Sequence, residues 1–175
     1  MRIIGVEKKC RTELEIAVNG AQPIKLYVGG IIDRFDEVTI DNERYTRIVD
    51  YKTSGSVCKY KGLDALFTPG EDKDHAHHIR QAFYYADVVM REDERLSSLY
   101  PTLMYVKLPK SCQPTIEFKE GRQPGKRVDF STIRNDYHDY LIKTLEEVFN
   151  KEVPFTQCTV QKVCANCDFK ELCNR

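Results

Sequence analysis

The sequence has little that would place the chain in a membrane or on an export pathway. No apolar run approaches the roughly 20 residues that a membrane-spanning helix needs. The first residues, MRIIGVEKK, lack the continuous apolar segment of a secretory signal. We therefore predict a cytoplasmic protein that has no membrane partner.

An excess of charge of one sign is also missing. Lysine and arginine together number 27, and so do aspartate and glutamate. Overall charge therefore does not indicate a nucleic-acid partner, and contact with DNA would need a local basic patch. Internal repeats and low-complexity segments are absent as well. The 175 residues, of which 41% are hydrophobic and 31% charged, predict one globular domain or one domain with a small appendage.

The first third of the sequence predicts an antiparallel meander of strands. Period-two alternation and β-branched residues favour strands at residues 2–8, 12–18, 24–36 and 44–53. Asn19-Gly20 and Asp41-Asn42 have the composition of the tight turns between them. Later in the chain, the same signals predict strands at residues 102–108 and 114–118.

Apolar residues at helical spacing predict two helices, at residues 75–91 and 131–150, with Ser131 as the N-cap of the second. Residues 55–74 show no clear period, and residues 119–127 read as a basic loop. We therefore expect an α/β fold, in which a mixed central sheet is flanked by helices. Its core would span residues 1–152, and a cysteine-bearing tail packed on that core would span residues 153–175.

Two aspartates and a lysine form the candidate active site. Asp33 and Asp50 lie near the ends of successive predicted strands, so neighbouring strands would bring both carboxylates to one end of the sheet. Lys52 follows Asp50 by two residues, which points both side chains to the same face. Two carboxylates beside an ammonium group can hold a hard cation and assist phosphodiester hydrolysis. Solvated charges on a surface turn are the ordinary alternative.

The flanking residues favour the metal site over a solvated turn. Ile31-Ile32 precedes Asp33 and Ile48-Val49 precedes Asp50, so both acids follow apolar positions that we expect to be buried. Gly29-Gly30 allows another segment to approach the backbone closely.

Three segments together resemble the RecB type of the PD-(D/E)XK nuclease superfamily. They are GGIIDRFD (29–36), IVDYKTS (48–54) and QAFYY (81–85). The family pattern is glycine–x–x–Asp–Arg, then Asp–Tyr–Lys–Thr, then a helix with Gln–x–x–x–Tyr. None of these motifs is specific alone, and their order and spacing make the match specific. The resemblance covers roughly residues 3–175 and implies a restriction-endonuclease-like core.

The resemblance also implies a role for each matching residue. Asp33 and Asp50 would be ligands of Mg²⁺ or Mn²⁺, with the backbone carbonyl of Tyr51 as a further metal contact. Lys52 would be the catalytic lysine.

Further residues take places around this centre by the same resemblance. Gln81 and Tyr85 would face the active site and either contact DNA or position the lysine. Glu7, on the first strand, resembles an acidic residue that joins the site in some members, and an exposed strand residue is the equal alternative. Arg34 and Asp36 are expected to support the site rather than to bind metal.

Many relatives carry a metal-binding histidine on a helix before the first strand, and this chain has no such helix. His75, His77 and His78 lie before the Gln81 helix instead, where they form a polar helix entrance or contact DNA phosphates. The missing helix and the strand that begins at Arg2 favour the hypothesis that the chain is a piece of a longer protein, with weakened metal affinity.

Three of the seven cysteines, Cys164, Cys167 and Cys173, lie within ten residues near the C-terminus. In a reducing compartment this spacing indicates a metal or iron–sulfur site before it indicates disulfides. It resembles the iron–sulfur staple of AddB-like and CRISPR-associated nucleases, whose fourth cysteine lies far upstream. We expect a [4Fe–4S] cluster in the full-length protein and an incomplete site in this chain. Cys158 as fourth ligand would make zinc an alternative, Cys10 is a weaker candidate, and free thiols in a packed tail are the other interpretation.

Basic and aromatic residues close to the active-site motifs are candidate DNA contacts. They are Lys59, Lys61, Arg80, Tyr60 and Tyr84, with a second basic run at Lys119, Arg122, Lys126 and Arg127. Lysine and arginine would follow phosphates, and tyrosine would stack on bases. Solvated surface charge is the alternative for each basic residue. The sequence contains no base-reading module, so sequence-specific recognition is not predicted.

These patterns predict a metal-dependent DNA nuclease domain, most simply an exonuclease that acts on single strands or duplex ends. By resemblance it would be the C-terminal nuclease domain of a helicase–nuclease in recombinational repair, with a stand-alone CRISPR-adaptation nuclease as the nearest alternative. A catalytically inactive DNA-binding or assembly domain is an alternative of another class. A zinc-bound structural module is a further alternative, and it leaves the Asp–Tyr–Lys–Thr and Gln–x–x–x–Tyr motifs unexplained.

Overall fold

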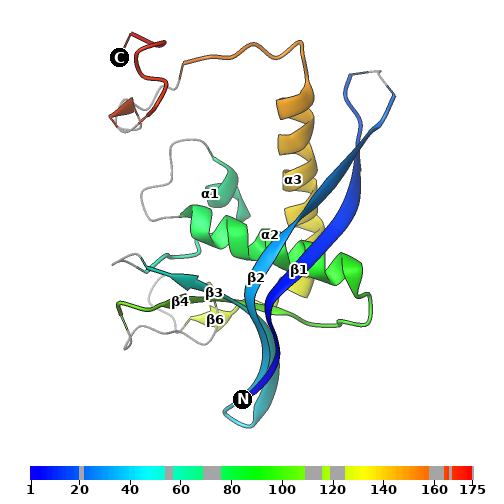
Figure 1. Ribbon diagram of the computed structural model, residues 1–175, viewed down its shortest axis with the longest axis vertical. Helices are drawn as coiled ribbons and strands as arrows, with labels where there is room; N and C mark the ends of the chain where they lie inside the picture. Colours follow the sequence, from blue (N-terminus) through cyan, green and yellow to red (C-terminus); the bar gives the residue numbers. More distant parts are fainter. Residues whose placement is uncertain are drawn as a thin grey trace.

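A mixed four-stranded sheet forms the centre of the protein (Figure 1). The computed structural model describes residues 1–19, 22–53, 57–68, 76–108, 116–118, 125–157, 164–165 and 167–174. The strand order is β1-β2-β3-β4, and the strands are β1 (Arg2–Ile16), β2 (Ile24–Ile40), β3 (Glu43–Lys52) and β4 (Tyr100–Tyr105). The first three pair antiparallel, and β4 pairs parallel to β3. The predicted α/β fold with its antiparallel meander is confirmed.

The hairpin of β1 and β2 extends well beyond the rest of the sheet. β1 pairs with β2 from Arg2 through Ile16, whereas β2 pairs with β3 only as far as Arg34 and Val49. Beyond that pair the hairpin separates from β3 and continues alone, as a twisted ribbon at the right of Figure 1. The sheet therefore has a fork where β2 and β3 part.

The prediction of two strands at residues 2–8 and 12–18 was wrong, because β1 is one continuous strand. Its pairing with β2 runs without interruption through Lys9, Cys10 and Arg11. The register is irregular between Ile3 and Gly5, and Glu7 has a left-handed backbone with φ of 48°. Such a bulge disturbs the period-two alternation without ending the pairing.

The turn between β2 and β3 is confirmed at Asp41-Asn42. These residues have φ values of 51° and 64°, as a two-residue turn between antiparallel strands requires. In the other predicted turn, Asn19 has a φ of 36° and Gly20 lies outside the described residues.

Helix α2 (Ala76–Glu92) supplies the core that packs on the sheet. Its apolar residues recur at helical spacing and are almost fully buried, among them Ile79, Ala82, Phe83, Ala86 and Val89. They join a single cluster with sheet residues that include Ile32, Phe35, Ile48 and Leu103. The predicted helix over residues 75–91 is confirmed, with its bounds one residue later.

Short elements fill the segments that lacked a period. Helix α1 (Leu63–Phe67) was not predicted, because five residues are too few to display a helical repeat. β5 (Glu117–Phe118) and β6 (Lys126–Arg127) form a separate two-stranded sheet, so the end of the predicted 119–127 loop is a strand.

The last helix, α3 (Arg134–Phe149), follows the 3-10 turn η3 (Phe130–Thr132). Ser131 is not an N-cap, because its own N–H donates to the Asp129 carboxylate at 3.0 Å. Tyr137 is the one buried residue of α3, and Val148 near its end is 72% exposed. The far half of α3 therefore leaves the core.

The tail begins after α3 and lies apart from the sheet, at the upper left of Figure 1. Residues 151–157 are all exposed, and so are Phe169 and Leu172. Its packing on the core stays a prediction. None of the described helices is long and apolar enough to cross a membrane.

Candidate active site

Asp33 and Asp50 lie at the fork where β2 and β3 part. The last cross-strand pair before the fork is Arg34 with Val49, so the same register continued by one residue brings Asp33 opposite Asp50. The Oδ2 atom of Asp33 accepts the N–H of Tyr51 at 2.7 Å. On this edge of β3, the Asp33 carboxylate thus accepts a backbone hydrogen bond that a paired strand would otherwise accept. The convergence that the strand pattern predicted is present in the structure.

Lys52 connects this acidic pair to α2. Its Nζ atom lies 2.6 Å from Asp50 Oδ2 and donates a hydrogen bond to Gln81 Oε1 at 2.6 Å. Gln81 Nε2 in turn donates to the hydroxyl of Tyr85 at 3.2 Å. Gln81 and Tyr85 are one helical turn apart on the same face of α2. Asp50, Lys52, Gln81 and Tyr85 therefore form one connected cluster, and the strand register places Asp33 opposite Asp50.

The environment of Asp50 disfavours its charged form. Burial raises the pKa of the Asp50 carboxyl, the Lys52 ammonium opposes this rise, and the charge of Asp33 adds to it. Among the described residues, Asp50 Oδ2 has no hydrogen-bond donor, although Lys52 Nζ lies close to it. The contact between Lys52 and Asp50 is a close ion pair, and the same ammonium donates to Gln81.

The donor set fits a hard divalent cation. Asp33, Asp50 and the carbonyl of Tyr51 offer oxygen atoms, which Mg²⁺ and Mn²⁺ prefer. The part of the chain that the structure describes has no group of three His, Cys, Asp or Glu side chains that could hold a metal ion. Backbone oxygen and water would complete the shell, as is usual for Mg²⁺.

Glu7 lies level with this site on β1. The pairs Val6–Arg34 and Lys8–Ile32 place it opposite Asp33. Its side chain is exposed and does not complete a three-ligand group with the two aspartates. Its metal role stays a prediction.

Two tyrosines of α2 meet two glycines of β2. The Tyr84 hydroxyl accepts the N–H of Gly29 at 2.7 Å and donates to the carbonyl of the same residue at 3.1 Å. A Cβ atom on Gly30 would lie 2.7 Å from the ring of Tyr85. The predicted close approach at Gly29-Gly30 is confirmed. Tyr84, which the sequence suggested as a base-stacking residue, has its hydroxyl engaged by β2.

A buried ion cluster joins β2 and β3 where they are paired, next to the fork. Asp36 is 0% exposed and accepts hydrogen bonds from Arg34 Nε at 2.8 Å and from Arg47 Nε at 2.8 Å. Arg34 also donates to the hydroxyl of Tyr51. Tyr51 is thus held both at its hydroxyl and, through Asp33, at its backbone N–H. These contacts restrain Tyr51, whose carbonyl is a proposed metal ligand.

The buried apolar positions next to the acids are only partly as expected. Ile32, Ile48 and Val49 are at most 2% exposed, whereas Ile31 is 51% exposed. The prediction for Ile31 was wrong, because the hairpin beyond the fork has one face in solvent.

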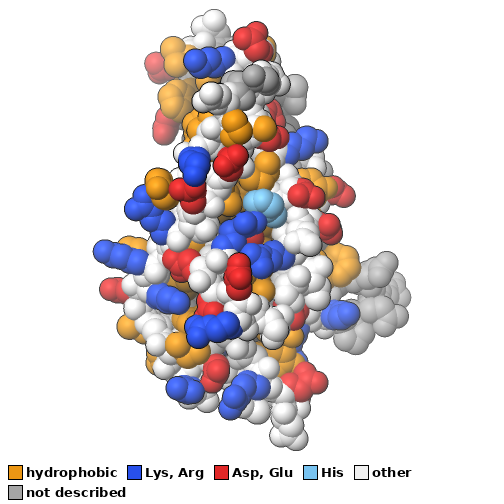
Figure 2. All heavy atoms as spheres, turned by 90° about the vertical axis from the view of Figure 1, so that its right-hand side faces the viewer, with side chains coloured by type: hydrophobic (Ala, Val, Ile, Leu, Met, Phe, Trp, Pro, Cys, Tyr) orange, Lys and Arg blue, Asp and Glu red, His pale blue; other side chains and the backbone are white. Residues whose placement is uncertain are grey.

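The candidate DNA contacts differ in their exposure and in their partners. Lys59 and Lys61 are exposed, Arg80 donates to the carbonyl of Leu66 at 2.6 Å, and Arg127 donates to Asp41 and Tyr45. Lys119 and Arg122 lie outside the described residues. On the face drawn in Figure 2, basic and acidic side chains are interspersed. Roles in DNA binding stay predictions.

A thiol–imidazole contact that no sequence motif indicated lies close to the Gln81 end of α2. Cys58 Sγ lies 3.4 Å from His78 Nδ1, and the N–H of Cys58 donates to the Tyr105 hydroxyl at 3.0 Å. His77 packs its ring against His78, and His75 lies outside the described residues. Only the fold reveals this contact, because twenty residues separate Cys58 from His78.

The cysteines of the tail are not brought together as a metal site within the described residues. Cys164, Cys167 and Cys173 are partly exposed free thiols, and Cys158 lies outside the described residues. Cys10 is buried in the β1–β2 hairpin, where its Sγ contacts the carbonyl oxygen of Gly30 at 3.6 Å. Cys10 is therefore part of the core of the hairpin, and its role as a metal ligand stays a prediction.

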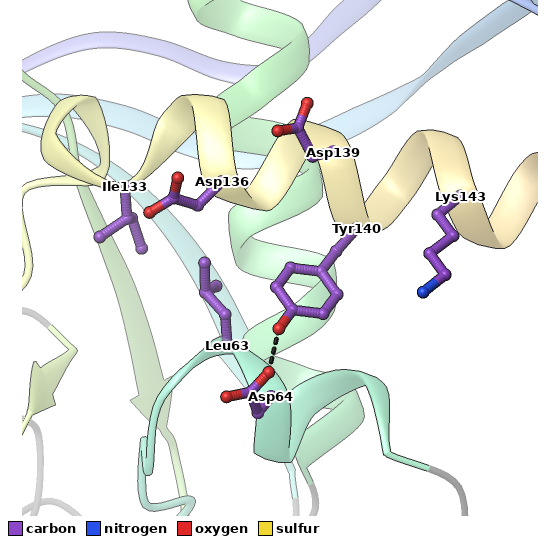
Figure 3. A pocket seen from close by; sticks show the side chains of 7 residues that line it. All are labelled: Leu63, Asp64, Ile133, Asp136, Asp139, Tyr140 and Lys143. Atoms are coloured by element: carbon purple, nitrogen blue, oxygen red, sulfur yellow. Dashed lines mark hydrogen bonds between the residues drawn. The ribbon is translucent and has the colours of Figure 1, made fainter.

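A separate pocket lies between α1 and α3 and shares no residue with the site (Figure 3). It is lined by Leu63, Asp64, Ile133, Asp136, Asp139, Tyr140 and Lys143. Three aspartates against one lysine give it a negative charge, which disfavours a phosphate-bearing ligand.

Comparison with known families gives a finding independent of this geometry. The family model described as the PD-(D/E)XK nuclease superfamily matches residues 1–174. No curated protein matches the sequence.

Proposed function

Because the chain belongs to the PD-(D/E)XK nuclease superfamily, we propose that it is a metal-dependent DNA nuclease whose active site is the fork between β2 and β3. The observation that carries the proposal is the contact of Lys52 with both Asp50 and Gln81, opposite Asp33. It joins three separate sequence motifs in one cluster.

Each residue of the cluster has a distinct task in this proposal. Asp33, Asp50 and the carbonyl of Tyr51 hold Mg²⁺ or Mn²⁺. When bound, such a cation lowers the pKa of a bound water and offsets charge on the phosphate. The Lys52 ammonium orients the attacking water and stabilises the negative charge that develops on the scissile phosphate. Gln81 fixes the position of Lys52.

The finer parts of the proposal follow from the RecB-type order of the motifs. We propose exonucleolytic cleavage of single strands or duplex ends, within a helicase–nuclease of recombinational repair, and a cytoplasmic location. A helicase domain or subunit would be the partner, and Lys59, Lys61 and Arg80 would contact the DNA. Cys164, Cys167 and Cys173 are the proposed ligands of an iron–sulfur staple. A stand-alone CRISPR-adaptation nuclease is the alternative with the same chemistry.

An inactive DNA-binding or assembly domain is the alternative of another class. Asp50, Lys52, Gln81 and Tyr85 are in contact as one cluster, and Asp33 lies opposite Asp50 by strand register. An inactive scaffold has no need of this arrangement, so catalysis is the better-supported function.

The proposal is tested by degradation of linear DNA in the presence of Mn²⁺. Asp50→Ala and Lys52→Ala should each lower the rate by about 10²–10³-fold, because each removes a group that stabilises developing charge. Asp139→Ala and Lys143→Ala, exposed residues of α3, are matched controls that should leave the rate unchanged. Equal rates in all five proteins would refute the proposal. A circular single strand tests the exonuclease assignment, since an exonuclease leaves it intact.

A further inference from the structure

Helix α2 contacts both edges of the β1–β2 hairpin at a single cross-strand pair. That pair is Arg11 on β1 and Gly29 on β2. On the inner edge, the Tyr84 hydroxyl bonds both the N–H and the carbonyl of Gly29, at 2.7 and 3.1 Å. On the outer edge, Glu92 Oε1 accepts the N–H of Arg11 at 2.6 Å. The peptide groups of this pair point away from the partner strand, as in a non-hydrogen-bonded antiparallel pair.

The inner contact replaces a missing strand. β3 pairs with β2 only from Arg34 onward, so among the described strands none pairs with this edge of β2 at Gly29. A hydroxyl can serve both peptide groups because it donates one hydrogen bond and accepts others. Burial raises the pKa of Tyr84, which keeps its hydroxyl protonated and able to donate. Tyr84 therefore hydrogen-bonds the edge of β2 at Gly29, as β3 does from Arg34 onward.

The same turn of α2 also holds the other half of the site. Gln81 accepts the hydrogen bond of Lys52, which lies against Asp50 of β3. One rigid helix thus contacts β2 through Tyr84 and β3 through Gln81.

We propose that Tyr84 is a positioning residue of the active site, which sets the place of β2, and with it Asp33, relative to Asp50 and Lys52. This inference rests on the proposed nuclease function. Gly29 is four residues from Asp33, about 13 Å along the strand, so Tyr84 acts through the strand rather than by contact. Functional groups must be held within about 0.5 Å of their working geometry. A small shift of β2 at Gly29, carried along the strand to Asp33, would therefore be enough to disturb the site.

The test is Tyr84→Phe, which keeps the ring in place and removes both hydrogen bonds. Mn²⁺ binding to the whole chain is measured by calorimetry, without substrate. We expect the affinity for Mn²⁺ to fall by about 10–100-fold, as for other residues that orient metal ligands. DNA cleavage should fall at low Mn²⁺ and recover at high Mn²⁺. A purely structural role would lower thermal stability without this dependence on Mn²⁺.

Tyr45→Phe is the matched control. Tyr45 is another tyrosine with a hydrogen-bonded hydroxyl, which donates to Glu43 on the same strand and accepts from Arg127 of β6, and neither partner belongs to the site. Its loss should leave Mn²⁺ affinity unchanged. Glu92→Ala releases the outer edge of the hairpin and gives a second measurement if Tyr84→Phe does not fold; a several-fold loss of affinity is expected.

Two results would overturn the inference. One is an unchanged Mn²⁺ affinity in Tyr84→Phe, or in Glu92→Ala where that variant is the one measured. The other is an equal loss in Tyr45→Phe, which would indicate general loosening of the fold. Failure of the proposed function looks different, since Asp50→Ala would then bind Mn²⁺ and cleave DNA like the original protein. If Asp50→Ala is inactive while Tyr84→Phe behaves like the original, only the role of Tyr84 is refuted.

Discussion

The fork between β2 and β3 differs from the cysteine tail in the range of the contacts that hold it. At the fork, Lys52 reaches Gln81 and Tyr84 reaches Gly29, so residues from distant parts of the chain touch. In the tail, the backbone hydrogen bonds join residues three or four positions apart, and Leu172 is 83% exposed. The geometry of the fork therefore depends on the whole core, while changes in the tail should stay local.

The largest difference between the two regions should come from Asp36→Ala. This change leaves Arg34 and Arg47 buried without their shared carboxylate, and breaking a buried ion pair costs about 3–5 kcal/mol. The matched change in the tail, Asp168→Ala at an exposed position, should alter the free energy of unfolding by less than about 0.5 kcal/mol. Urea denaturation followed by circular dichroism measures both. Similar losses in the free energy of unfolding for the two variants would show that the fork and the tail do not differ in this way.

A smaller loss of stability is expected from Gly29→Ala. The new Cβ atom would lie 2.2 Å from the backbone oxygen of Cys10, so the hairpin must shift, at a cost of about 1–3 kcal/mol. Gly5→Ala on the same hairpin is the control, because its nearest neighbour would be 3.9 Å away. Thermal unfolding of the two variants tests this, and equal melting temperatures would show that the hairpin accommodates the methyl group freely.

Acidification should weaken the fork and leave the tail unaffected. Because burial raises the pKa of Asp50, a proton competes with the cation at a higher pH than for an ordinary aspartate. Mn²⁺ affinity should therefore fall as the pH drops through this raised pKa. Lys52→Met removes the charge that opposes the rise and should move the fall to higher pH. Calorimetric titration across a pH series measures both, and identical profiles would show that Lys52 does not act on Asp50.

The same shift has the opposite sign for stability without metal. A raised pKa means that the fold favours the neutral carboxyl, so this contribution to stability is lost as the pH rises through it. Asp50→Asn should accordingly raise the free energy of unfolding at neutral pH while abolishing cleavage. A protein that is less stable than the original would contradict this account of Asp50.

The smallest effect is expected in the tail itself. Replacement of Cys164, Cys167 and Cys173 together by serine should change the free energy of unfolding of this chain by less than about 0.5 kcal/mol, because these thiols are partly exposed. DNA cleavage should be unaffected. Iron or zinc in the purified chain, together with a loss of several kcal/mol in the triple variant, would show instead that the tail is stapled by metal.

The sequence by itself determined the kinds of elements and the identity of the cluster. Alternation of period two predicted the meander, and helical spacing predicted α2, because each element must bury one face. Asp33, Asp50, Lys52 and Gln81 could be named because their motifs carry both a residue type and a strand or helix context. These properties are local, so they can be read along the chain.

Only the tertiary structure decided which partner each side chain takes. Tyr84 and Tyr85 are adjacent tyrosines on one helix, yet one bonds the edge of β2 and the other bonds Gln81. Asp129 rather than Ser131 caps the turn before α3, and Ile31 lies in solvent while Ile32 is buried. Such choices depend on strand register and on the distance between segments far apart in sequence, which local periodicity does not encode.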